Sequence, residues 1–117
     1  MRDPGHPTAQ ALADLTQGHG SRLITVQYDA GSEQSAANAV SELQADHDID
    51  HLDIVVANAG ISKKWPLVKD VKLADIQEHV QVNVLGVVSL YQATRDLLQK
   101  SAKPIFAAVG SLAGSLG

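Results

Sequence analysis

The chain has 117 residues, of which 44% are hydrophobic, and it carries a formal net charge of −4 and no cysteine. This length suits a single domain that can bury a core, and the lack of cysteine excludes disulfides and thiolate-based metal sites. The mild, unsegregated acidity excludes a basic face for nucleic acid, and no stretch reaches the about 18 consecutive apolar residues of a membrane span.

The first half of the chain predicts helices that alternate with strands. Residues 1–7 contain two prolines and a glycine, which indicate a loop. No apolar leader follows Met1, so a cytoplasmic protein is expected. A short helix is expected over Thr8–Leu15 and a strand over Arg22–Tyr28. Ser32 is then expected to cap a helix of about fifteen residues.

The second half of the chain predicts a strand, a helix and a strand. The apolar run Leu52–Ala57 is typical of a buried parallel strand, and Ile105–Val109 is expected to form another. Between them, one long helix is expected from about Leu73 to Gln99. Its middle, Val80–Leu90, is apolar on more than one face, so the helix is expected to be covered on two sides. Such a helix could also join two copies of the chain in a homo-oligomer.

This order of elements predicts an α/β fold. Alternating helices and strands favour a parallel sheet with right-handed crossovers, here with three strands and flanking helices. Aromatic residues make up only 3% of the chain, so the core must come from aliphatic side chains, as is usual in parallel sheets. Residues 1–117 are expected to form one domain.

Polar and small residues follow the strand expected at Leu52–Ala57. Asn58, Ala59 and Gly60 would lie at the carboxyl edge of the sheet, where ligands bind in open α/β folds. Asn58 could equally satisfy backbone groups in a turn, as asparagine often does.

Other polar residues carry weaker patterns. His47 and His51 have a spacing found in metal ligands, but a helix C-terminus that runs into a polar loop explains them as well. No metal site is therefore expected. Lys63 is expected to be a solvated loop charge, and His79 has no surrounding pattern that indicates a role.

Three short motifs follow one another on the expected elements. Asn58-Ala59-Gly60 follows a buried strand, Asn83-Val-Leu-Gly86 lies inside the long helix, and Gly110-Ser111-x-x-Gly114 follows the last strand. Each motif alone is weak, but their order and spacing over essentially all 117 residues resemble the middle of a short-chain dehydrogenase/reductase. The lead-in Ile49–Asp53 and the segment at Asn83 resemble fungal-type ketoreductases.

The resemblance implies one incomplete, Rossmann-like (doubly wound) domain that binds NADP or NAD and acts on a carbonyl or alcohol substrate. In the family, the Asn58-Ala59-Gly60 turn passes beside the cofactor's ribose, and an acid at the place of Asp29 hydrogen-bonds the adenine. Arg2 lies where the adenosine 2′-phosphate is often bound, which favours NADP over NAD. Asp29 could also be only the acid of a turn that precedes a helix.

The resemblance also implies two catalytic positions. Ser111 matches the catalytic serine, whose hydroxyl donates to the substrate carbonyl as negative charge develops on its oxygen. Asn83 matches the asparagine that locally distorts the long helix and helps to hold a proton-relay water. Without the surrounding motifs, Ser111 would be read as an ordinary surface serine.

The chain departs from the family at both ends. It lacks the Thr-Gly-x-x-x-Gly-x-Gly turn that holds the pyrophosphate, and no Tyr-x-x-x-Lys pair, the family's acid/base pair, follows Ser111. Tyr28 and Tyr91 have Ser32 and Arg95 four residues later in place of lysine. The 117 residues alone are therefore expected to be inactive and to hold the cofactor poorly. The alternatives are a non-catalytic Rossmann-fold remnant, a dimerising module or a truncated gene model.

The strands that the resemblance implies have an unusual problem of pairing. They match the third, fourth and fifth strands of the doubly wound order 3-2-1-4-5-6. Because the second and first strands separate the third from the fourth, Arg22–Tyr28 is expected either to pair directly with Leu52–Ala57 or to lack its native neighbours. An unpaired parallel edge would favour aggregation.

Overall fold

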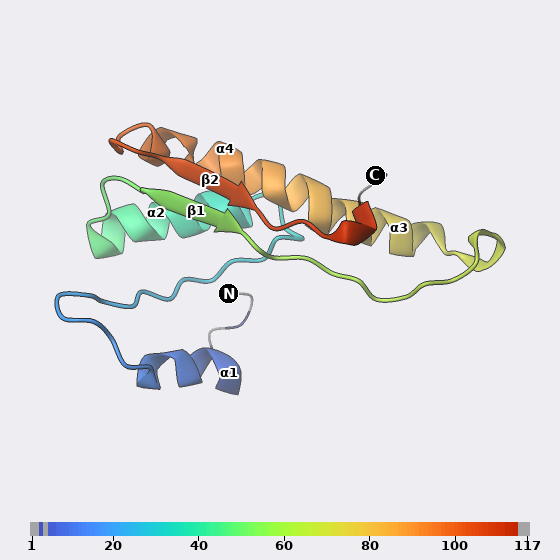
Figure 1. Ribbon diagram of the computed structural model, residues 1–117, viewed down its shortest axis with the longest axis horizontal. Helices are drawn as coiled ribbons and strands as arrows, with labels where there is room; N and C mark the ends of the chain where they lie inside the picture. The colour runs from blue at the N-terminus through green and yellow to red at the C-terminus, as the bar shows by residue number, and fades with distance from the viewer. Residues whose placement is uncertain (1–2, 4, 115–117) are drawn as a thin grey trace.

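The computed structural model describes residue 3 and residues 5–114, with a short parallel sheet backed by helices on one face (Figure 1). In chain order the elements are α1 (Pro7–Gln10), the 3-10 turn η1 (Ala11–Asp14), α2 (Ser35–His47), β1 (Ile54–Ala57), the 3-10 turn η2 (Val68–Asp70), α3 (Leu73–Val80), the π-helical turn η3 (Gln81–Leu85), α4 (Gly86–Leu98), β2 (Ile105–Ala108) and the 3-10 turn η4 (Leu112–Gly114). The expected α/β class is confirmed.

The sheet consists of β1 and β2, which run parallel in a register that pairs Ile54 with Ile105 and Ala57 with Ala108. Further hydrogen bonds extend the ladder at both ends. Ile105 N–H donates to the Asp53 carbonyl at 2.8 Å, and Val109 N–H donates to the Ala57 carbonyl at 3.0 Å. Both strands therefore end at the same edge, as expected for parallel strands joined by a helical crossover.

The core lies between the sheet and the helices α2 and α4. Side chains alternate along β1, so Val55 and Ala57 are buried while Ile54 and Val56 are exposed. The buried side chains are small and aliphatic: Ala30, Ala36, Ala39, Val40, Val55, Ala57, Leu97 and Leu98. Thr94 is also buried, and its hydroxyl donates to the Leu90 carbonyl at 2.8 Å, which satisfies its polar group within the helix.

The expected third strand over Arg22–Tyr28 is wrong. Ile24, Val26 and Tyr28 alternate with exposed neighbours, as in a strand, but the segment belongs to no sheet in the described part of the chain. A strand needs a neighbouring strand for its ladder, and among the described residues β1 pairs only with β2. In the doubly wound order this segment would not be the neighbour of β1, so the direct pairing considered above does not form.

The expected long helix is present as one continuous path through α3, η3 and α4 (Figure 1). It ends at Leu98, close to the expected Gln99. Its expected burial on two sides is not observed, because Val84 is 52% exposed and Val88 is 47% exposed. One side of α4 packs on the sheet and on α2, and the opposite apolar side faces outward.

The N-terminal residues form a separate short helical segment, α1 with η1, that Figure 1 draws apart from the sheet. Pro7 stands at its first position, where proline's missing N–H costs no helical hydrogen bond, and the His6 ring accepts from Thr8 N–H at 3.3 Å. This agrees with the helix expected over Thr8–Leu15. Across the described residues, no helix is both long enough and apolar enough to cross a membrane.

Candidate functional site

Asn83 fastens the segment that follows β1 to the long helix. Its Oδ1 accepts from Ile61 N–H at 2.8 Å, and its Nδ2 donates to the Ile61 carbonyl at 2.9 Å. The amide thus uses a donor and an acceptor on the same backbone residue. A Cβ placed on Gly60 would lie 3.4 Å from the Asn83 Oδ1, so the two family motifs are direct neighbours.

The helix is distorted where Asn83 sits. Residues 81–85 form a π-helical turn between α3 and α4, and Asn83 is at its centre. A π-helical turn inserts an extra residue into the helix and frequently marks functional sites. The local distortion expected at Asn83 is therefore present.

Asp29 organises the turn before α2. Its Oδ1 accepts from Gly31 N–H at 2.9 Å, and its backbone N–H donates to the Ser35 Oγ at 2.8 Å. The helix begins at Ser35 with Gln34 as its N-cap, so the cap expected at Ser32 is wrong. Ser32 lies in the preceding turn, where its N–H donates to the Asp29 carbonyl. Asp29 therefore has the turn role considered above, through its Oδ1. The Oδ2 atom makes no hydrogen bond within this turn.

Gly86 allows α4 to approach the same turn. A Cβ at this position would lie 2.6 Å from the Ala30 carbonyl oxygen and 3.0 Å from the Ala30 Cβ. The Tyr28 hydroxyl donates to the Gly86 carbonyl at 3.3 Å. Burial raises the pKa of Tyr28, and the neighbouring Asp29 carboxylate raises it further. This tyrosine is therefore a structural hydrogen-bond donor between the turn and the helix.

An open cleft of about 790 Å³ lies between these segments. One wall is formed by residues 28–31, the opposite wall by residues 59–61 with Lys63, and the rest by Gln77, Glu78, Gln81 and Val82. Its volume is in the range of small-molecule sites, about 300–1,000 Å³. A smaller cavity of about 140 Å³ adjoins it, and Asn58 is among the residues that line it.

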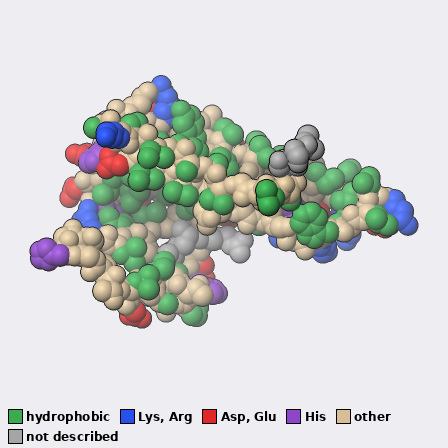
Figure 2. Space-filling view, in the orientation of Figure 1, with side chains coloured by type: hydrophobic (Ala, Val, Ile, Leu, Met, Phe, Trp, Pro, Cys, Tyr) green, Lys and Arg blue, Asp and Glu red, His purple; other side chains and the backbone are tan. Residues whose placement is uncertain are grey.

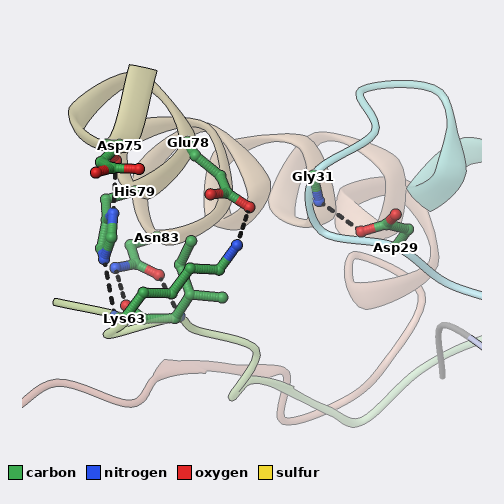
Figure 3. Close-up of polar contacts among 8 residues, drawn as sticks. Asp29, Gly31, Lys63, Asp75, Glu78, His79 and Asn83 are labelled. Atoms are coloured by element: carbon green, nitrogen blue, oxygen red, sulfur yellow. Dashed lines mark hydrogen bonds and ion pairs between the residues drawn. The ribbon is translucent and has the colours of Figure 1, made fainter. Parts of the chain in front are cut away.

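Figure 3 shows how the two walls are held. On one wall, the Asp29 carboxylate turns back to Gly31. On the other, Asn83 and His79 point from the helix toward the loop that carries Lys63. The structure therefore brings Asp29, Ala59 and Gly60 to one cleft, with Asn83 directly behind it.

Ser111 is placed differently. It is exposed after β2, its Oγ accepts from Ala113 N–H at 3.0 Å, and its carbonyl accepts from Gly114 N–H at 3.1 Å. It therefore starts the turn η4 at the carboxyl edge of the sheet and does not line the cleft. Arg2 lies outside the described residues.

Sequence patterns missed the polar residues that hold the loop. Lys63, expected to be solvated, pairs with the Glu78 carboxylate, and Lys63 N–H donates to the His79 Nε2 at 3.2 Å. The available signal was spacing: His79 lies four residues before Asn83, which places both side chains on the same helix face.

The two histidines with metal-like spacing have other partners. The His51 Nδ1 lies 2.6 Å from the Asp50 carboxylate and its Nε2 lies 3.6 Å from that of Asp53. The His47 carbonyl accepts from the Arg22 guanidinium at 2.6 Å, at the end of α2. Within residue 3 and residues 5–114, no group of three or more His, Asp or Glu side chains could hold a metal ion.

Comparison with known proteins identifies the family of the chain. Its sequence matches the family described as short chain dehydrogenase over residues 3–117, so the chain belongs to that family. It is 44% identical over 103 residues to the norsolorinic acid ketoreductase stcE of Emericella nidulans, covering 88% of this chain and 39% of that protein. It is 36% identical over 118 residues to the short-chain dehydrogenase srdF of Neurospora crassa, covering 100% of this chain and 46% of that protein. The chain thus spans less than half the length of these relatives.

Solved structures show the same fold. The NADPH-bound carbonyl reductase from chicken fatty liver matches 98% of this chain with a TM-score of 0.86 and 26% identity, over 48% of its own chain. A short chain dehydrogenase from Burkholderia cenocepacia in complex with NADP matches 89% of this chain with a TM-score of 0.75 and 31% identity, over 40% of its own chain. The expected partial Rossmann-like fold and the fungal ketoreductase-type resemblance are confirmed.

Proposed function

We propose that this chain is the central part of an NADP-dependent short-chain reductase that transfers hydride to a carbonyl group of a small molecule. The observation that carries the proposal is that Asp29 and Gly60, from two separate family motifs, both line one cleft of small-molecule size. The ketoreductase relatives and the NADP-bound structural neighbours support the direction and the cofactor.

The residues of the cleft fit the adenosine part of the cofactor. The free oxygen of the Asp29 carboxylate can accept from the adenine amino group, because only its Oδ1 is bonded to Gly31 N–H. Ala59 and Gly60 present a wall of minimal side chains, with Asn58 beside them, along which a ribose can lie. Arg2 is proposed to favour the 2′-phosphate of NADP. When bound, the nicotinamide would supply the hydride.

Ser111 and Asn83 are proposed to serve the reaction. The Ser111 Oγ accepts a hydrogen bond from Ala113 N–H, which leaves its proton available to donate to a substrate carbonyl oxygen. The Asn83 amide is engaged with Ile61, so this residue is proposed to act by fixing the π-helical turn around which a relay water would be held.

A second proposal concerns the 117-residue polypeptide on its own. No Tyr-x-x-x-Lys pair follows Ser111 within these residues, so the general acid of the family is lacking from the polypeptide itself. We propose that it has negligible turnover and only weak cofactor affinity. A non-catalytic role as a dimerising module is favoured by one observation, the outward apolar side of α4.

Cofactor binding can be tested by NMR, because chemical-shift mapping detects weak binding. Millimolar NADPH added to the isotope-labelled chain is expected to shift the amide signals of Gly31, Gly60 and Ile61. Asp29→Asn should lower the apparent affinity for NADPH, measured from these shifts, roughly tenfold, because a hydrogen bond to a charged group contributes about that factor. Asp96→Asn is the matched control, because Asp96 is exposed on α4 and does not line the cleft. Shifts confined to other surfaces, or none, would contradict the proposal.

Turnover is tested separately by following NADPH absorbance with a ketone substrate. We expect no oxidation above background from the 117-residue chain. Oxidation that disappears in Ser111→Ala would show that the chain is catalytically sufficient and would overturn the second proposal.

A further inference from the structure

The wall of the cleft that contains Gly60 includes a loop tied to the helix at Ile61 and Lys63. Residues 60–63 are called loop 60–63 below. Ile61 is bonded through both its N–H and its carbonyl to Asn83, and the Lys63 ammonium pairs with the Glu78 carboxylate. The remaining tie is the 3.2 Å hydrogen bond from Lys63 N–H to the His79 ring.

The geometry of His79 requires one protonation state. Its Nδ1 lies 2.6 Å from the Asp75 carbonyl oxygen, which can only accept, so Nδ1 must carry a proton. Its Nε2 receives the Lys63 N–H, so Nε2 must carry a lone pair. Both contacts are therefore made only by the neutral ring protonated at Nδ1. Figure 3 shows the ring lying between Asp75 and the backbone of Lys63.

We propose that His79 is a positioning residue of the cleft, whose neutral, Nδ1-protonated ring fixes the backbone of Lys63 and so holds loop 60–63 against α3. The loop carries Gly60 and the Lys63 side chain, which both line the cleft, while Glu78 and Gln77 line it from α3. His79 itself does not line the cleft, so its effect passes through Lys63. The consequence for cofactor binding rests on the proposed function, whereas the positioning itself does not.

The charged groups around the ring are few and nearly balanced. From α3 they are the carboxylates of Asp75 and Glu78, and from the loop they are the ammonium groups of Lys63 and Lys64. Because Glu78 is paired with Lys63, protonation of the ring would chiefly act by placing a second donor opposite Lys63 N–H. The tie between loop and helix should therefore be released as the ring becomes protonated.

The test uses NMR on the isotope-labelled chain. Long-range proton–nitrogen correlation is expected to show His79 as the Nδ1–H tautomer at neutral pH. When the pH is lowered far enough to protonate the His79 ring, the Lys63 amide proton should move upfield. In His79→Phe the Lys63 amide should exchange with solvent roughly fivefold faster, the factor of one hydrogen bond of ordinary strength. His79→Gln should restore part of the protection, because its side-chain oxygen can accept from Lys63 N–H.

His51→Gln is the matched control, because the His51 ring faces Asp50 and Asp53 at the other end of β1 and should leave Lys63 unchanged. An Nε2–H tautomer, or a Lys63 amide that ignores both pH and His79→Phe, would overturn the proposal. If His79→Phe fails to fold, the tautomer and the pH dependence of the unaltered chain still decide. If NADPH causes no amide shifts in the unaltered chain, that result would count against the proposed function and not against the positioning role of His79.

Discussion

Gly86 shows how one residue sets the distance between two elements. The missing side chain allows the Ala30 carbonyl to lie where a Cβ would be 2.6 Å away, which is too close for any substitution without movement. The close approach of Ala30 to Gly86 also brings Tyr28 near the helix, where its hydroxyl donates to the Gly86 carbonyl. Since residues 28–31 form a wall of the cleft, the glycine of the family motif acts on the site through packing.

Gly86→Ala is therefore expected to lower the free energy of unfolding by about 1–3 kcal/mol, because backbone must move to admit the Cβ. Gly110→Ala is the control: no atom of the described residues lies within 4 Å of its added Cβ, so a change within about 0.5 kcal/mol is expected. Urea unfolding followed by circular dichroism measures both. Equal effects of the two substitutions would show that the approach of Ala30 does not limit this position.

His51 offers a prediction on pH. The hydrogen bond that the His51 ring donates to Asp50, followed by the charge of Asp53, raises the pKa of His51 above its usual 6.5. The same bond lowers the pKa of Asp50 below its usual 3.8. The histidine contribution to stability is present below the unfolded pKa and is lost as pH rises through the folded pKa. The aspartate contribution is present above its unfolded pKa and is lost as pH falls through its folded value. The pair thus stabilises between these limits, weakly, because it is exposed.

Asp50→Asn should move the midpoint of the His51 ring back toward 6.5, since it removes the first of these causes. A proton NMR titration of the ring signals measures the midpoint. Asp70→Asn, whose carboxylate pairs with Lys69 on another turn, should leave it in place. An unchanged midpoint in Asp50→Asn would assign the elevation to Asp53 instead.

The family motifs named Gly60 and Asn83 as site residues. They did not show that Asn83 would bond to the backbone of Ile61, next to Gly60. Lys63 was expected to be a solvated charge, and its side chain is 51% exposed, but its contact with His79, sixteen residues away, was not predicted. No local pattern around a lone histidine or a loop lysine reports which backbone N–H will lie opposite it.

At the scale of elements, α4 and β2 are joined by an aromatic pair. The rings of Tyr91 and Phe106 have centroids 5.1 Å apart and planes at 84°, an edge-to-face arrangement. This contact joins α4 to the last strand, β2. The pair gives a structural role to Tyr91, one of the two tyrosines of the sequence.

A double-mutant cycle of Tyr91→Leu and Phe106→Leu should give a coupling energy of about 0.5–1.5 kcal/mol beyond the area lost. Trp65→Leu combined with Phe106→Leu is the control cycle, because Trp65 is 82% exposed in a loop, and its coupling should be close to zero. Chemical unfolding of the variants gives the energies. Additive effects in the first cycle would contradict a specific ring contact.

The elements were predictable to the extent that they are local. Helical periodicity placed α2, α3 and α4, and the buried run placed β1, each within a few residues of the observed ends. The strand expected over Arg22–Tyr28 failed because alternation predicts an extended, half-buried chain but not the neighbour that would bond to it. Pairing is decided by segments distant in sequence, so periodicity cannot supply it.

For the whole molecule, two apolar faces remain outward. On the sheet, Ile54, Val56 and Ile105 point away from the helices, and Figure 2 shows hydrophobic side chains over this face. On the long helix, Val84 and Val88 are about half exposed. Surfaces of this kind are typical of sites that pack against other protein. The homo-oligomer expected through residues 73–99 remains a proposal that these faces support.

Sedimentation velocity over a range of concentrations should therefore show self-association. Val84→Glu together with Val88→Lys is expected to weaken it at least tenfold, because it places charges in an apolar contact without changing the net charge. Gln92→Glu, exposed on the same helix, is the control and should have little effect. A monomer at every concentration, or association that the double variant leaves unchanged, would place the contact elsewhere or exclude it.

The π-helical turn has a consequence for the phase of the long helix. Each residue of an α-helix advances the chain by about 100°, so an extra residue in one turn rotates everything beyond it by about that angle. Thr94, Leu97 and Leu98 meet the core in the phase that follows the turn at residues 81–85. If the same residues were wound as an uninterrupted α-helix, these side chains would be rotated by about 100° relative to α3. The distortion that carries Asn83 therefore also aims the second half of the helix, which couples the geometry of the cleft to the packing of the core.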